Sequence, residues 1–159
     1  MNTTAFRPPQ SVDEVIYRIQ AAPVGRCSFK LPNIPSVNLQ AYSLETVIAE
    51  KFHTMLDRDE YNSRMKDFFD CYQLLTKREL DDETLYYAIK ATFDNRELEY
   101  NPKLKLFTAM FVNDANRQMQ WKLFLRKIQW KEELSFNVVM QVITDRLKPM
   151  AEKYWKNNL

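Results

Sequence analysis

The prolines of this chain are unevenly distributed, and their distribution limits where long helices can form. Five of the seven prolines lie before residue 43, and only Pro102 and Pro149 lie beyond it. Each proline fixes φ and lacks a backbone donor, so the early prolines rule out a long helix there. We therefore expect an irregular, partly extended N-terminal arm over residues 1–42 and a helical domain over residues 43–159.

The expected fold class is mainly α, a helical bundle-like body with a short irregular arm. Within the arm, weak alternation of apolar residues predicts one or two short strands, at residues 27–31 and 37–42. Residues 15–19 are expected to form a short helical or extended piece.

Capping residues and apolar spacing predict the helices of the body. Ser43 caps a helix that ends near Leu56, and a charged loop follows over residues 57–62. The further helices are expected at 63–77 with Ser63 as cap, at 83–94 with Asp82 as cap, at 103–112 with weaker support, from Asn113 or Asp114 to Ile128, and after Ser135. Pro149 is expected to kink or interrupt the last helix.

Composition excludes several kinds of site. The single glycine, Gly25, cannot build a glycine-rich phosphate loop. Cys27 and Cys71 have no metal-ligand spacing, and His53 has no histidine partner. The sequence contains no apolar run of membrane-spanning length and no apolar signal-peptide region. We therefore expect a cytoplasmic protein with no membrane partner.

The C-terminal part of the chain is basic. From Arg117 onward there are nine Lys/Arg against four Asp/Glu, and tryptophans and a phenylalanine are interspersed among them. Such a segment can contact RNA, and it can equally be a solvated basic helix face above an aromatic core. The pattern alone favours the second interpretation.

Lys51 has an unusual position in the first predicted helix. At 100° per residue it falls within the apolar arc, between Val47 and Met55 at i−4 and i+4. An unpaired buried ammonium is costly, so the lysine must extend to water or meet a carboxylate. Periodicity alone favours extension to water.

The second predicted helix carries four charges close together. Arg64, Lys66, Asp67 and Asp70 fall on the arc opposite its apolar side. A face of this kind is usually solvated surface, although the same groups also suit phosphate chemistry, because cations neutralise phosphate oxygens.

Residues 41–52 (AYSLETVIAEKF) and 62–70 (NSRMKDFFD) together resemble the AbiEii/AbiGii nucleotidyltransferase family. These are bacterial toxins of type IV toxin–antitoxin and abortive-infection systems, and the resemblance covers roughly residues 37–155. It implies that Lys51 contacts nucleotide phosphates and that Asp67 is the late catalytic acidic residue. It also implies supporting roles for Glu50, Arg64, Lys66 and Asp70. Mg²⁺ and a nucleoside triphosphate are the implied cofactors, and some members modify the acceptor end of tRNA.

The chain departs from this family at its first motif. The family has a Gly-Gly or Gly-Ser turn followed by paired aspartates that hold the metal. Asp13 and Gly25 are the only aspartate and glycine before Ser43, and they do not make this motif. Asp57 and Asp59 have the paired spacing, but no glycine turn precedes them, so we interpret them as a surface loop.

We therefore expect a truncated or split AbiEii-like toxin fragment that retains the Lys/Asp half of the nucleotide site and is inactive alone. Its expected partners are a second chain with the missing core or a cognate antitoxin, and RNA or a second copy of the chain are further candidates. The alternatives are a non-enzymatic helical module that binds RNA or a partner protein, and a degenerate remnant. Whether the chain is an enzyme is left open by the sequence.

Overall fold

The computed structural model describes residues 26–29, 37–40 and 43–158. Two short strands, β1 (Arg26–Phe29) and β2 (Val37–Gln40), pair antiparallel, with Arg26 opposite Gln40. Each strand overlaps one of the two ranges expected to be extended. The element expected at residues 15–19 lies outside the described residues.

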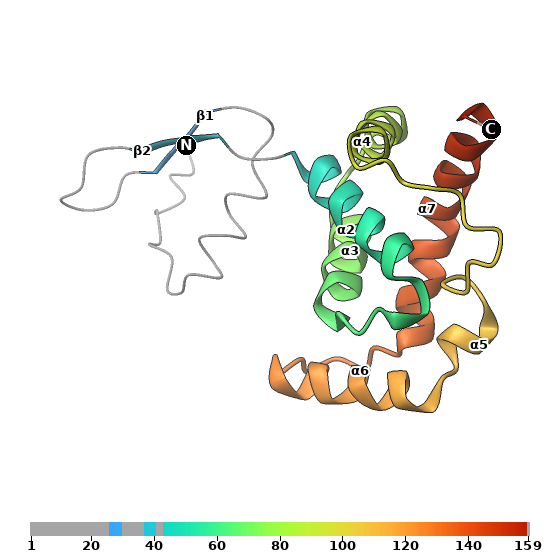
Figure 1. The fold of residues 1–159 in the computed structure, drawn as a ribbon. Coiled ribbons are helices and arrows are strands. Elements are labelled where there is room, and N and C mark those ends of the chain that lie inside the picture. Colours follow the sequence, from blue (N-terminus) through green and yellow to red (C-terminus); the bar gives the residue numbers. More distant parts are fainter. Residues whose placement is uncertain (1–25, 30–36, 41–42, 159) are drawn as a thin grey trace.

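The body is a bundle of helices, so the predicted mainly α fold class is confirmed (Figure 1). In chain order the helical elements are α2 (Leu44–Arg58), the 3₁₀ turn η1 (Asp59–Tyr61), α3 (Met65–Lys77), α4 (Asp82–Asn95), α5 (Ala109–Val112), α6 (Ala115–Lys127) and α7 (Phe136–Asn158). Helix α2 packs on α3 and α4, and α3 also packs on α7 and α6. Figure 1 shows α6 at the bottom of the bundle, below α3.

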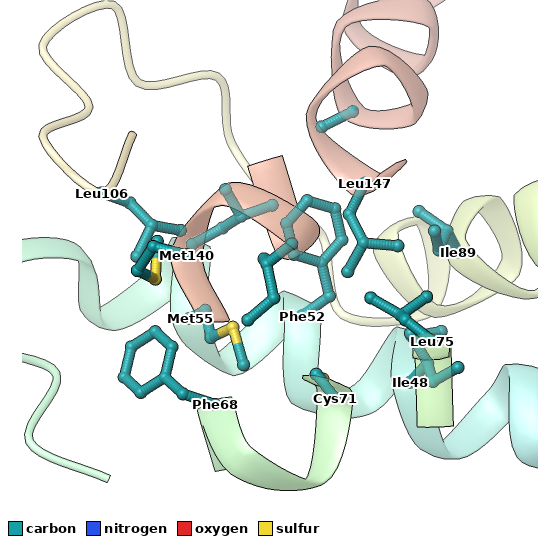
Figure 2. Close-up of a cluster of buried hydrophobic side chains, with 14 of the residues drawn as sticks. Ile48, Phe52, Met55, Phe68, Cys71, Leu75, Ile89, Leu106, Met140 and Leu147 are labelled. Carbon is teal, nitrogen blue, oxygen red and sulfur yellow. The ribbon is translucent and has the colours of Figure 1, made fainter. Parts of the chain in front are cut away.

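One apolar core holds α2 and α3 in place. Figure 2 shows Phe52 of α2 and Phe68 of α3 among side chains contributed by α4, α7 and the loop before α5. Both rings are fully buried. Burial of one such side chain stabilises a fold by about 1.5–3 kcal/mol, so the core fixes α2 against α3 and with them the polar residues at their edges.

Two of the predicted N-cap residues, Ser43 and Asp114, are confirmed, and two others are wrong. Ser43 Oγ accepts a hydrogen bond from the Thr46 amide at 3.1 Å, and Asp114 caps α6. Helix α4 is capped by Asp81 instead of the predicted Asp82. The prediction that Ser63 is the N-cap of α3 is also wrong. Asn62 Oδ1 accepts from the Arg64 amide at 2.9 Å, so a turn built on Asn62 precedes α3 and Arg64 becomes its N-cap.

The predicted charged loop at residues 57–62 is wrong. Asp57 and Arg58 form the last turn of α2, and Asp59 begins η1. Asp59 Oδ1 accepts hydrogen bonds from the Lys105 amide at 2.9 Å and the Leu106 amide at 2.7 Å. The Asp59 side chain therefore links η1 to the loop that precedes α5. Because these two amides bond to Asp59, residues 103–108 do not form a helix. Of the helix predicted at residues 103–112, only the four residues of α5 are helical.

Pro149 does not interrupt the last helix, although interruption was one of the two outcomes expected for it. Helix α7 continues past Pro149, from Phe136 to Asn158. A proline inside a helix costs about 3 kcal/mol. Leu147 and Ala151 on either side are fully buried, and their packing offsets that cost. No helix in the described ranges is long and apolar enough to cross a membrane.

Candidate functional site

Lys51 lies in the middle of α2, and its side chain is only 18% exposed. Its ammonium donates a hydrogen bond to Asp67 Oδ1 at 2.8 Å, and Asp70 Oδ2 lies at the same distance. The preference for extension to water, which rested on periodicity, is therefore wrong. Two carboxylates from α3 neutralise the ammonium where it leaves the core.

Asp67 and Asp70 are one turn apart on α3, so both reach the same side of the helix. Their side chains are 16% and 21% exposed, and they face α2. The prediction that they share a solvated face with Arg64 and Lys66 is wrong for the two aspartates. It holds for the two cations, whose side chains are 56% and 71% exposed.

Each aspartate is shared between Lys51 and an exposed cation. Lys66 Nζ lies 2.8 Å from Asp70 Oδ2, and Arg64 Nη1 lies 3.7 Å from Asp67 Oδ2. We call these five residues, Arg64, Asp67, Lys51, Asp70 and Lys66, the charge cluster. Its formal charge is +1, with the half-buried pairs at the centre and exposed cations at its two ends.

The charge cluster keeps Lys51 protonated. Burial disfavours the charged ammonium, but Asp70 and Asp67 more than offset this effect, and together they raise the pKa of Lys51 above its ordinary value. Cys71 follows Asp70 in α3 and is fully buried. Burial raises the pKa of its thiol strongly, so Cys71 remains neutral and is not a nucleophile.

Glu50 is not part of the charge cluster, although the resemblance gave it a supporting role. Its carboxylate forms an ion pair with Arg96, the C-cap residue of α4. Glu50 therefore connects α2 to the end of α4. The other five predicted site residues come together as the charge cluster.

An open groove with a volume of ≈ 610 Å³ lies beside the charge cluster, between the start of α3 and α6. We call it the α3–α6 groove. Its lining residues are Ser63, Arg64, Met65, Lys66 and Asp67 on one wall and Gln120, Leu123, Phe124 and Lys127 on the other. Asp67 belongs to both features, because it lines the groove and also binds Lys51.

The α6 wall was missed as part of a site by the sequence analysis. In the sequence, Phe124 and Lys127 are two members of the basic, aromatic segment that begins at Arg117, and nothing in the pattern distinguishes them from the others. The available signal was the composition of α6, which contains four cations and no acidic residue. Only the packing of α6 on α3 shows which of those cations can reach the charge cluster.

The described residues do not fit a magnesium site. Within the described ranges, no group of three or more His, Cys, Asp or Glu side chains is arranged to hold a metal ion. Asp67 and Asp70, the two carboxylates of the charge cluster, are both engaged by Lys51. We therefore assign no step to a metal held by these residues alone.

Cations that line a groove can neutralise the oxygens of a phosphate group, and a lysine held in place by aspartates can contribute to this. The chain belongs to the family of AbiEii nucleotidyl transferase toxins of type IV toxin–antitoxin systems, since the model of that family matches residues 8–142. The match begins within the N-terminal arm and ends within α7. No curated protein and no solved structure matches the chain.

Proposed function

We propose that this chain supplies the lysine–aspartate part of a nucleotide site in an AbiEii-type nucleotidyltransferase toxin. The observation that carries the proposal is the contact of Lys51 with Asp67 and Asp70 beside the α3–α6 groove. Family membership supplies the reaction class, the transfer of a nucleotidyl group. A type IV toxin–antitoxin family also implies a cognate antitoxin as partner.

In this proposal Lys51 and Asp67 act as a pair. An ammonium has three N–H donors, and Lys51 directs two of them to Asp67 and Asp70. One donor is left for a phosphate oxygen. The same contacts hold the Asp67 carboxylate in one position at the edge of the groove, where it can accept a hydrogen bond from a bound substrate. Fixed placement of charged groups is the main catalytic resource in phosphoryl chemistry.

The proposal includes no nucleotidyl transfer by the isolated chain. Transfer of this kind needs carboxylates that hold metal ions against the triphosphate. Such a set is absent from the described residues, and Asp13 with Gly25 does not make the glycine–aspartate motif. A second chain that carries this motif would complete the site.

The proposal is tested by nucleotide binding and label transfer with the full chain. The parent chain is expected to bind ribonucleoside triphosphates, and Lys51→Ala and Asp67→Asn are expected to weaken binding by about tenfold each. Lys90→Ala is the matched control, because Lys90 also forms an ion pair with an aspartate, Asp94, and does not line the groove. Incubation with Mg²⁺, labelled nucleotide and tRNA is expected to leave the RNA unlabelled. Robust label transfer by the isolated chain, or unchanged binding by both site variants, would refute the proposal.

A further inference from the structure

The α3–α6 groove brings together three cations from distant parts of the sequence. Arg64 and Lys66 belong to the start of α3, and Lys127 is the last residue of α6. All three side chains are exposed. Lys127 forms no ion pair with any residue in the described part of the chain. Lys66 is paired with Asp70 and Arg64 lies near Asp67, so Lys127 is the cation that gives the groove an excess of positive charge.

The backbone adds to this charge. Helix α3 begins at the groove, because its N-cap residue Arg64 and its first residue Met65 both line it. The positive end of the helix dipole therefore faces the same space as the three cations. A ligand with several negative charges close together is the best match.

The α6 wall of the groove carries two apolar side chains, Leu123 and Phe124, together with the polar Gln120 and Lys127. Leu123 is 53% exposed, so its side chain is accessible to a ligand in the groove. The Phe124 ring packs edge-on against Phe69, with the centroids 5.6 Å apart, and Phe124 also lines the groove. Leu123 and Phe124 thus give this wall an apolar part, and Phe124 supplies an aromatic ring of the kind that bases stack on.

We propose that the α3–α6 groove is the seat of the nucleotide, with the triphosphate held by Arg64, Lys66 and Lys127 and the base against Leu123 and Phe124. This inference rests on the proposed function and gives it a location and a new residue, Lys127. The groove volume of ≈ 610 Å³ lies within the range of about 300–1,000 Å³ that small-ligand pockets occupy. A short groove of this size suits one nucleotide better than an extended strand of RNA.

The test compares two lysines of the same helix. Lys127→Glu is expected to weaken binding of a ribonucleoside triphosphate to the full chain by at least about tenfold. Lys122→Glu is the matched control, because Lys122 is exposed on α6 but does not line the groove. Both variants are measured at a salt concentration that screens the general effect of the charge change. Under these conditions the affinity of Lys122→Glu for the nucleotide is expected to stay within about twofold of that of the parent. Lys127→Arg, which keeps the charge, is expected to retain binding. Since both lysines are exposed, the melting temperatures of the variants are expected to match the parent.

The outcomes separate this inference from the proposed function. If the parent binds nucleotides and Lys127→Glu binds them equally well, the inference is wrong and the proposed function stands. If the parent binds no nucleotide at low salt, the proposed function itself fails. If Lys127→Glu weakens binding of a short single-stranded RNA and leaves nucleotide affinity unchanged, the groove takes RNA and the inference is overturned.

Discussion

Lys51 and Arg117 are both cations that the fold has removed largely from water, but their partners differ. Lys51 meets two aspartate side chains. Arg117, which is 9% exposed, packs over the Phe111 ring and donates only to backbone carbonyls. Its acceptors are the carbonyl oxygens of Phe111 at 3.1 Å, Asn62 at 2.6 Å and Glu60 at 3.0 Å.

The two environments shift the pKa values in opposite directions. Burial lowers the pKa of Arg117, because carbonyl dipoles and the more distant carboxylates of Asp114 and Asp59 only partly replace water. The neighbouring aspartates raise the pKa of Lys51. Backbone acceptors cannot change partners without unfolding, whereas Asp67 and Asp70 are shared with exposed cations of the surface. Arg117 is thus a structural cation, and Lys51 sits in a network that an incoming anion can rearrange.

The largest expected effect comes from removal of the structural cation. Arg117→Met keeps most of the volume but leaves buried carbonyls without donors, and it is expected to lower the free energy of unfolding by about 3 kcal/mol. Urea denaturation followed by circular dichroism measures this loss. Arg126→Met, at an exposed position of the same helix, is the control and is expected to change stability by less than about 0.5 kcal/mol. Equal losses in the two variants would contradict the structural role of Arg117.

A smaller effect is expected at the charge cluster. Lys51→Met is expected to cost about 1–2 kcal/mol of stability, because two half-buried carboxylates lose a donor. A double-mutant cycle with Asp67→Asn is expected to give a coupling energy of at least about 0.5 kcal/mol. The same cycle on the exposed pair Lys66 and Asp70 is expected to give only a few tenths. A coupling near zero for Lys51 and Asp67 would show that their contact contributes nothing to the fold.

The smallest effect is a dependence on alkaline pH. The pKa of Lys51 is raised in the folded protein above its ordinary value of 10.5, so its stabilising contribution is complete below that value and is lost as pH rises through the folded pKa. The stability difference between the parent and Lys51→Met is therefore expected to be constant from about pH 7 to 9 and to shrink above about pH 10.5. Denaturant titrations of both proteins at each pH measure it, and the difference cancels other titrating groups such as Tyr154. A difference that grows with pH would mean that the ammonium destabilises the fold.

Local sequence signals predicted much of the body but only part of the site. The cap at Ser43 and the end of α3 near Lys77 follow from short-range chemistry, and the structure has both. The contact between Lys51 and Asp67 could not follow from periodicity, because it depends on how α2 and α3 pack. Only the family resemblance indicated it.

The missed features depend on contacts between distant segments. Arg117 was counted as one charge of a basic surface, and nothing near it in sequence shows that it is buried under the chain that follows α2. Asp59 was interpreted as part of a surface loop for the same reason, since its two backbone partners lie beyond α4. The α3–α6 groove requires both walls to be placed in three dimensions.

The short segment of residues 59–62 acts as a common anchor for both walls of the α3–α6 groove. Asn62 begins the turn that leads into α3, and the carbonyls of Glu60 and Asn62 hold Arg117 of α6. The spacing of α3 and α6 thus depends on the hydrogen bonds of residues 59–62 as well as on the apolar core. The width of the groove and the stability of the fold therefore depend on the same contacts, those of Arg117 with the carbonyls of Glu60 and Asn62. A substitution that weakens these contacts would change the groove only at a cost in stability.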